Sequence, residues 1–373
     1  MLLANEQIEL QDLARDFALK EIKPRALDFE SQLNFDQALL NALWELGSFN
    51  LTINEEFGGL SMGFVDLAIV LHEIAYACMA VGQVVASSVI ALFALNLLGN
   101  HNQKKYFNSN IEGKLLGYDL NLTKYLNYHN LPVKLEARLV NDKFMVNGQI
   151  DFLTNASQAQ WFIVPVKLDS QIQIVVIDNL PENIKITKSF NTFGKKIHQV
   201  SSVEITNLSI SKINILGEMV PKTYQEFLTR TNLIQAINFN AGLSRATDEA
   251  VLYASQRSTF GKLIKDHQGV TFMLADMAKE VNIANSLILN CASLIDCFKE
   301  DFLFSLNTLN FILQNGENLA LNAVQILGGY GYCKEYKVEK ILRDIKTSIL
   351  ELPDKGEISE IVGKEYCQNN LIK

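Results

Sequence analysis

The spacing of apolar residues changes twice along this 373-residue chain. Up to about residue 112, apolar side chains recur every three or four positions, as at Leu10, Ala14 and Phe17, which is the period of an amphipathic helix. From about 115 to 217 they alternate with polar residues, as in half-buried strands, and from about 220 the helical period returns. This order predicts an α+β fold rather than a βαβ repeat. We expect a helical domain over 1–114, a β domain over 115–218 and a helical domain over 219–373.

Inside the middle segment, short apolar runs predict individual strands. The runs are WFIVPV (161–166), IQIVVI (172–177) and VSSVEIT (200–206). The pair Asn147-Gly148 has the composition of a tight hairpin turn, so we expect the chain to reverse there. In the last segment, helices are expected over 268–298 and 302–326.

Composition excludes several classes of function. The net charge is −8, charged residues make up 20% of the chain, and no block of five or more Lys and Arg occurs, which argues against binding to nucleic acid. The five cysteines are scattered without CxxC spacing, so neither a metal site nor a disulfide framework is expected, and a reducing cytoplasm is predicted. The motifs GxGxxG, GxxxxGK[ST], HExxH and GxSxG do not occur.

One apolar segment is almost long enough to span a bilayer. It is VGQVVASSVIALFALNLLG, residues 81–99. Gln83, Ser87, Ser88 and Asn96 interrupt it, and no Lys or Arg flanks its N-terminal end, so we interpret it as a buried core helix and not a membrane span. The first thirty residues lack the apolar core of a signal peptide.

Two local patterns have the composition of ligand sites. In YASQRSTFGKLIKDHQ (253–268), a helix is expected to carry Arg257, a turn follows at Phe260-Gly261, and a second helix opens near Gln268. Arg257 offers a two-pronged donor to a phosphate. In AVQILGGYGY (323–332), three glycines allow backbone N–H groups to approach an anion or a planar ring. Each pattern alone also fits an ordinary helix end or turn.

Taken together and in this order, these segments resemble the acyl-CoA dehydrogenase family over nearly the whole chain. Further matching segments are NEEFGGL (54–60), HEIA (72–75), VNGQIDFLTNASQAQWFIV (146–164), VEITNLSISKINILGE (203–218) and the pair Arg343-Asp344. The resemblance implies an N-terminal helical domain, a central β domain and a C-terminal four-helix domain.

The resemblance also implies a cofactor, FAD, lying between the domains and across a subunit contact of a homodimer or homotetramer. An electron-accepting flavoprotein is the implied partner, and no metal is expected. The cofactor-binding residues carried over from the family motifs are Arg257, Phe260, Gln268, Gln325, Gly328, Gly329, Thr123, Phe152 and Thr154.

The chemistry implied by the resemblance is α,β-dehydrogenation of an acyl thioester, carried by CoA or by a carrier protein. In this family a carboxylate removes the α proton while hydride passes to the flavin. Most members place that glutamate about nine residues after the arginine of the Arg-Asp pair, and counting from Arg343 reaches Leu352. Glu351 stands one place earlier and Asp354 two places later, in a segment longer than the family's.

Other positions also depart from the family pattern. Lys124 stands where the family has a glutamate, and the alternative position for a base, on the first long C-terminal helix, falls at Thr231 and Asn232. Neither of these two residues is a base. Three interpretations therefore stay open for the proton acceptor, namely Glu351, Asp354 or no conventional base. The corresponding functions are a divergent acyl-thioester dehydrogenase, a non-catalytic or heteromeric partner subunit, or a flavin monooxygenase or oxidase on the same fold.

Overall fold

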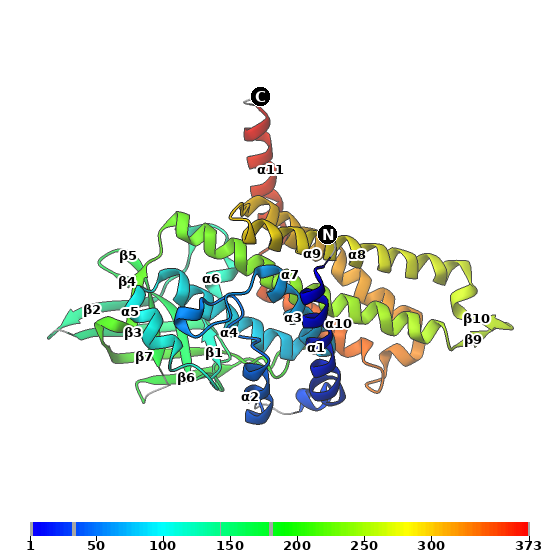
Figure 1. Ribbon diagram of the computed structural model, residues 1–373, viewed down its shortest axis with the longest axis horizontal. Helices are drawn as coiled ribbons and strands as arrows, with labels where there is room; N and C mark the ends of the chain where they lie inside the picture. The colour runs from blue at the N-terminus through cyan, green and yellow to red at the C-terminus, as the bar shows by residue number, and fades with distance from the viewer. Residues whose placement is uncertain (1–2, 32–34, 142, 179–181, 372–373) are drawn as a thin grey trace.

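The N-terminal part of the computed structural model is helical (Figure 1). The structure describes residues 3–31, 35–141, 143–178 and 182–371. The principal helices of this part are α1 (Asn5–Phe17), α2 (Gln37–Glu45), α3 (Phe64–Ala77), α4 (Met79–Leu98) and α5 (His101–Asn108).

Helix α4 is the centre of this helical layer. Within the described residues it is the one helix long and apolar enough to cross a membrane, and 78% of its most apolar 18-residue window is buried in the protein. A helix that is apolar on every side suits the interior of a large helical protein. The structure therefore contains the core helix predicted from residues 81–99.

The middle of the chain forms an eight-stranded, mostly antiparallel sheet in the order β6-β7-β3-β2-β4-β5-β8, with β1 pairing parallel to β4. The predicted runs at 161–166, 172–177 and 200–206 lie in β4, β5 and β7. The strands are β1 (Leu116–Tyr118), β2 (Leu135–Val140), β3 (Lys143–Thr154), β4 (Trp161–Leu168), β5 (Gln171–Asp178), β6 (Ile184–Ser189), β7 (Val200–Ile210) and β8 (Ile215–Glu218).

The hairpin predicted at Asn147-Gly148 is wrong. Both residues lie inside β3, where the register with β7 shifts between Val146 and Gly148. Gly148 adopts a φ of 130°, and an added Cβ would collide with the backbone oxygen of Lys134, the residue just before the adjacent strand β2. The glycine thus serves a bulge within a continuous strand instead of a chain reversal.

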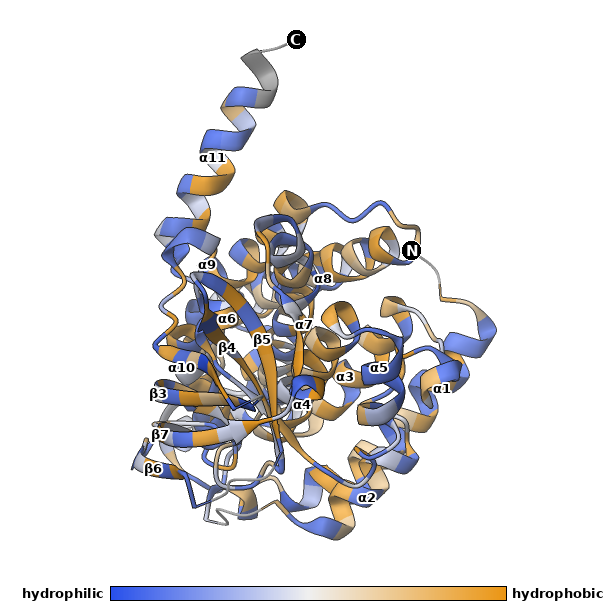
Figure 2. Ribbon diagram, turned by 90° about the vertical axis from the view of Figure 1, so that its left-hand side faces the viewer, coloured by the Kyte–Doolittle hydropathy of each residue, from blue (hydrophilic) through white to orange (hydrophobic). Residues whose placement is uncertain are grey.

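The C-terminal part returns to long helices. They are α7 (Pro221–Ala254), α8 (Gln268–Asp296), α9 (Phe302–Leu327), α10 (Val338–Glu351) and α11 (Lys355–Leu371), with the two-stranded hairpin β9 (Ser258–Thr259) and β10 (Lys262–Leu263) after α7. Helix α7 ends at Ala254, so Arg257 lies beyond the helix on which it was predicted. Helix α11 projects away from the body of the molecule (Figure 1 and Figure 2). The order helices, sheet, helices confirms the predicted α+β fold.

Candidate functional site

An apolar cavity of about 450 Å³ lies where the sheet meets α10. Its wall includes Phe152, Phe190 and Phe193, and the rings of the first two lie 5.4 Å apart at 32° to each other. A mostly apolar wall with few polar groups is typical of a small-molecule site, and aromatic faces suit a planar ring. A larger hollow of about 630 Å³ beside the start of α7 has a mostly polar and charged wall, which fits an apolar ligand less well.

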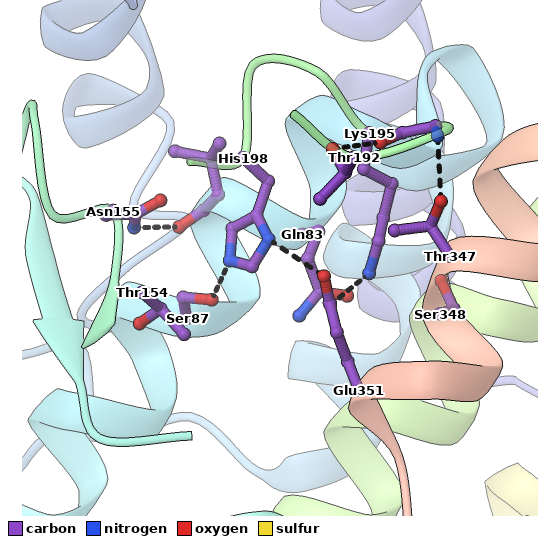
Figure 3. Close-up of polar contacts among 12 residues, drawn as sticks. Gln83, Ser87, Thr154, Asn155, Thr192, Lys195, His198, Thr347, Ser348 and Glu351 are labelled. Carbon is purple, nitrogen blue, oxygen red and sulfur yellow. Dashed lines mark hydrogen bonds and ion pairs between the residues drawn. The ribbon is translucent and has the colours of Figure 1, made fainter. Parts of the chain in front are cut away.

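Glu351 forms part of the cavity wall at the C-terminal end of α10. Leu352 leaves the helical conformation, and Pro353 cannot continue a helix, so the carboxylate sits on the last turn. The Glu351 side chain is buried and its carboxylate pairs with the ammonium of Lys195, while His198 Nδ1 lies 3.7 Å from Oε1 (Figure 3). The candidate carboxylate is therefore not free in the cavity.

Lys195 and His198 both come from the loop between β6 and β7, and α10 fixes that loop. The Gly194 N–H donates to Thr347 Oγ1 at 2.7 Å, and the Lys195 N–H donates to Asp344 Oδ1 at 2.6 Å. A Cβ on Gly194 would overlap the backbone of Arg343, so only glycine allows this close approach. The Arg343-Asp344 pair thus acts inside the chain, holding the loop that carries Lys195.

Arg343 itself anchors α10 to the N-terminal part. Its guanidinium donates to both carboxylate oxygens of Glu30, at 2.6 and 2.8 Å, and to Glu339 on its own helix at 2.8 and 2.9 Å. Hydrogen bonds to these carboxylates raise the pKa of Arg343 further above its ordinary value. Paired, planar contacts of this type define geometry as well as adding energy.

His198 is held from its other side by Ser87 of α4, with 2.9 Å between His198 Nε2 and Ser87 Oγ. Burial lowers the pKa of His198, although the negative charge of Glu351 opposes that effect. The ring is therefore neutral near pH 7, and the arrangement favours Nε2 accepting from the Ser87 hydroxyl with Nδ1–H directed at Glu351. Glu351 consequently faces two donors from one loop.

The charges around Glu351 decide its protonation state. Burial raises the pKa of this carboxyl, but the attraction of Lys195 and His198 outweighs burial and lowers the pKa to about 2. The group is ionised at all physiological pH values. A general base is most effective with a pKa near the working pH, so Glu351 is a permanently available but weak base as the structure holds it. Its catalytic role stays a prediction.

Of the residues predicted to contact the flavin ring, one lines the cavity and two face the protein core. Phe152 lines the cavity. Thr154 instead faces the core, where its hydroxyl donates to the Tyr118 carbonyl at 3.2 Å and accepts from the Tyr118 N–H at 2.9 Å. Thr123, in the short helix α6 (Asn121–Lys124), is also buried, with Oγ1 3.2 Å from the Tyr118 hydroxyl. Both threonine hydroxyls already have partners inside the protein.

The remaining predicted cofactor residues gather at the other end of the molecule, beside β9 and β10 (Figure 1). Tyr253, at the end of α7, packs against Tyr330 with 6.1 Å between ring centroids, which brings the Arg257 segment next to the glycine segment. Within the described residues the Arg257 guanidinium has no ion-pair partner, and Phe260 is 98% exposed. Gln268, Gln325, Gly328 and Gly329 are exposed as well.

The residues present fit FAD in two separate places, one suited to the flavin ring and one suited to a phosphate. The cavity beside Phe152 has the aromatic, apolar wall that a flavin ring needs, and the exposed cluster at Arg257 offers an unpaired cation and open glycine backbone for a phosphate. The cavity wall includes Glu317 of α9, whereas the Arg257 cluster lies beyond the C-terminal ends of α7 and α9, so the two halves are separate on one chain. Among the described residues, no group of three or more His, Cys, Asp or Glu could hold a metal ion.

Lys195, His198 and Ser87 were not identified from the sequence. The segment FGKKIHQV reads as a polar loop, and the serine lies in an otherwise apolar helix. The available signal was the isoleucine at 197 and valine at 200, because apolar residues flanking Lys195 and His198 indicate a partly buried loop. Residues 111 and 156 positions apart meet here, and spacing along the sequence carries no information about such contacts.

Comparison with family models matches most of the chain. The model "Acyl-CoA dehydrogenase, N-terminal domain" matches residues 4–111, and the model "Acyl-CoA dehydrogenase, C-terminal domain" matches residues 222–350. The fold is similar to the solved structure of butyryl-CoA dehydrogenase from Megasphaera elsdenii. The TM-score is 0.90 and the identity 23%, and the match covers 98% of this chain and 99% of that one.

Three relatives align with this chain along almost their full length. An acyl-CoA dehydrogenase of Bacillus subtilis is 28% identical over 98% of this chain and 99% of its own. A 3-(aryl)acrylate reductase of Clostridium sporogenes is 30% identical over 99% of both chains. A subunit of the caffeyl-CoA reductase–Etf complex of Acetobacterium woodii is 30% identical over 93% of this chain and 94% of its own.

Proposed function

Because this chain belongs to the acyl-CoA dehydrogenase family, we propose that it is an FAD-dependent enzyme that dehydrogenates an acyl thioester between its α and β carbons. Family membership makes it an acyl-CoA dehydrogenase-like oxidoreductase, with dehydrogenation or reduction as the general chemistry. The observation that carries the finer proposal is the cavity whose wall contains both Phe152 and Glu351.

In this proposal FAD, when bound, supplies the acceptor for hydride from the β carbon. Phe152 and Phe190 would hold the ring, and Arg257 with the exposed backbone at Gly328 would hold the phosphate half from a neighbouring copy. The apolar wall excludes water, and Glu351 accepts the α proton at a carboxylate oxygen. The thioester is carried by CoA or by a carrier protein. CoA is supported by two relatives, an acyl-CoA dehydrogenase and a subunit of a caffeyl-CoA reductase complex.

An electron-transferring flavoprotein is the proposed redox partner. The support comes from one relative that is a subunit of a reductase–Etf complex. A cytoplasmic location and assembly as a homodimer or homotetramer belong to the same proposal.

Two measurements test this function. The absorption spectrum of the purified protein should contain flavin bands, and anaerobic addition of acyl-CoA or acyl-carrier substrates should bleach them. The absence of bleaching with a broad panel of thioesters would exclude the dehydrogenase proposal. Glu351→Gln tests the base, because turnover should fall by several orders of magnitude. The matched control is Glu357→Gln, which removes a partly buried carboxylate on α11 and should keep turnover.

A non-catalytic partner subunit is the second candidate function. The observation that favours it is the ion pair between Glu351 and Lys195, which leaves the cavity without an unpaired carboxylate at this position. This alternative expects a colourless protein, or a yellow one that no thioester bleaches. Turnover by the isolated chain would exclude it.

A further inference from the structure

Four buried side chains from three distant segments form one polar unit at the cavity wall, here called the Glu351 unit. It consists of Ser87 on α4, Lys195 and His198 on the β6–β7 loop, and Glu351 on α10 (Figure 3). Their exposed fractions are 0%, 1%, 1% and 8%. Lys195 is thus a fully buried lysine, which is rare unless the charge has a specific partner.

Structural stability alone is a poor explanation for this unit. Desolvation of two buried charges often cancels their attraction, and well-packed apolar residues are commonly as stable. Lys195 also adopts a φ of 49°, a left-handed conformation that costs energy for a residue other than glycine. Backbone strain combined with a buried pair at the wall of a cavity is typical of a functional constraint.

We propose that Lys195 and His198 are positioning residues that hold the Glu351 carboxylate ionised and in a fixed orientation at the cavity wall. Lys195 supplies the compensating charge, and His198, oriented by Ser87, directs a ring N–H toward the second carboxylate oxygen. The inference rests on the proposed function, in which this carboxylate accepts the substrate proton. It adds that the unit, and not Glu351 alone, sets the protonation state of the site.

No other group near Glu351 can replace Lys195. Tyr118 faces the unit but is neutral, since burial raises its pKa well above the ordinary value. On α10, Asp344 pairs with Lys340, and at the cavity wall Lys346 pairs with Glu317. The remaining wall cation, Lys124, donates to the Leu350 carbonyl at 2.8 Å. Among the described residues, Lys195 is the only ammonium in ion-pair contact with Glu351.

Removal of Lys195 therefore has a defined consequence. Without the ammonium, burial becomes the dominant influence on the Glu351 carboxyl, and burial favours the protonated form. The pKa of Glu351 should then rise above that of a free glutamate. A variant that keeps a cation at this position should restore the ionised form.

Infrared titration of the protein without added ligand measures this directly. The C=O band of a protonated Glu351 is identified by subtracting the spectrum of Glu351→Gln at each pH. In wild type we expect no such band down to pH 4, whereas in Lys195→Met it should appear at or above pH 5. Lys195→Arg should resemble wild type. Lys196→Met is the matched control, because Lys196 is adjacent and, in the part of the chain that the structure describes, its ammonium hydrogen-bonds to Asn191 alone.

Enzyme kinetics provide the second measurement. In Lys195→Met, kcat/KM should be at least about twofold lower at pH 5 than at pH 8, beyond any change in wild type over that range, because the base becomes protonated. A loss in Lys195→Met that is independent of pH, with Glu351 titrating as in wild type, overturns the proposal. If Glu351→Gln keeps full turnover while the titration shifts as expected, the proposed catalytic role fails and the coupling within the unit stands.

Poor folding of Lys195→Met would still give a result. The double variant Lys195→Met/Glu351→Gln removes both charges, so its urea midpoint should be higher than that of Lys195→Met alone if the pair is coupled. Equal midpoints for the single and double variants contradict the proposal.

Discussion

At the scale of single residues, Glu351 links the stability of the protein to acid pH. Its pKa is lowered from 4.5 to about 2 in the folded protein, so the folded state binds the proton less tightly than the unfolded chain. The stabilisation is complete above about pH 4.5 and is lost as pH falls toward 2. Relative to its protonated form, ionised Glu351 contributes on the order of 3 kcal/mol to stability by this linkage.

The expected result is a loss of about 2 kcal/mol in the free energy of unfolding between pH 5 and pH 3 that depends on Glu351. Urea unfolding of wild type and Glu351→Gln at both pH values measures it. The variant should lack this component, because glutamine does not titrate. Parallel pH dependence of the two proteins would contradict the assigned ionisation.

Asp119 has the opposite relation to pH. It is buried after β1, and burial together with the charge of Asp151 raises its pKa from 3.8 to about 7, although Oδ1 accepts the Asn121 N–H at 3.0 Å. The folded state therefore holds the proton more tightly than the unfolded chain, and stability falls as pH rises from about 4 to about 7.

Asp119→Asn should remove this loss, because asparagine keeps an oxygen acceptor and carries no charge. We expect the variant to match wild type near pH 4 and to be more stable by roughly 2–4 kcal/mol at pH 8. Urea midpoints at both pH values measure the difference, with Asp178→Asn, an exposed carboxyl at the end of β5, as the control. A stabilisation that is the same at pH 4 and pH 8 would exclude ionisation as its cause.

At the scale of elements, the contact between the β6–β7 loop and α10 depends on one glycine. A Cβ at residue 194 overlaps the Arg343 backbone, which cannot move without shifting α10. Gly194→Ala should therefore destabilise the protein by about 1–3 kcal/mol and displace Lys195 from Glu351. Gly363→Ala, on α11, is the control: no atom of the described residues lies within 4 Å of its added Cβ, so stability should stay equal or rise by up to about 1 kcal/mol. Thermal unfolding of both variants decides the outcome.

The elements themselves were largely predictable from the sequence, and the contacts between them were not. Hydrophobic period is a local property, and it correctly separated the long helices from the sheet. Asn147-Gly148 was misread because the same residue types serve turns and bulges, and the partner strand decides between them. Arg257 was placed on a helix that ends three residues earlier, an ordinary boundary error.

Some residues of the candidate site could likewise be predicted from the sequence, and others could not. The family motifs led to Glu351 and Phe152, both of which lie at the cavity wall. The partners of Glu351 could not be found in this way, because Lys195 and His198 reach it only through the packing of the β6–β7 loop against α10. Thr123 and Thr154 matched family positions, yet their hydroxyls bond to Tyr118 inside the core.

At the scale of the whole molecule, we propose that a second copy of the chain completes the FAD site. The cavity lies between the sheet and α10, while Arg257 follows the end of α7 and Gly328 follows the end of α9. A closed dimer of identical chains places each end of one copy against the other copy in a self-complementary way. Each complete site would then combine the cavity of one chain with the Arg257 cluster of its partner.

Mixing two inactive variants tests this division. Arg257→Ala should lose flavin retention, and Glu351→Gln should lose turnover, each as a homo-oligomer. In a mixed dimer, the cavity of the Arg257→Ala chain meets the intact Arg257 of the Glu351→Gln chain, so one of the two sites is complete. Random one-to-one assembly after co-refolding should recover on the order of a quarter of wild-type activity, because half of the dimers are mixed.

Two controls make the result decisive. Arg138→Ala removes an exposed arginine of β2 far from either half and should neither lose flavin nor alter the mixture. The double variant, which carries both changes in one chain, should restore no activity when it is mixed with either single variant. If each site were built within a single chain, neither chain of the mixed dimer would hold a complete site. The mixture would then stay as inactive as its components.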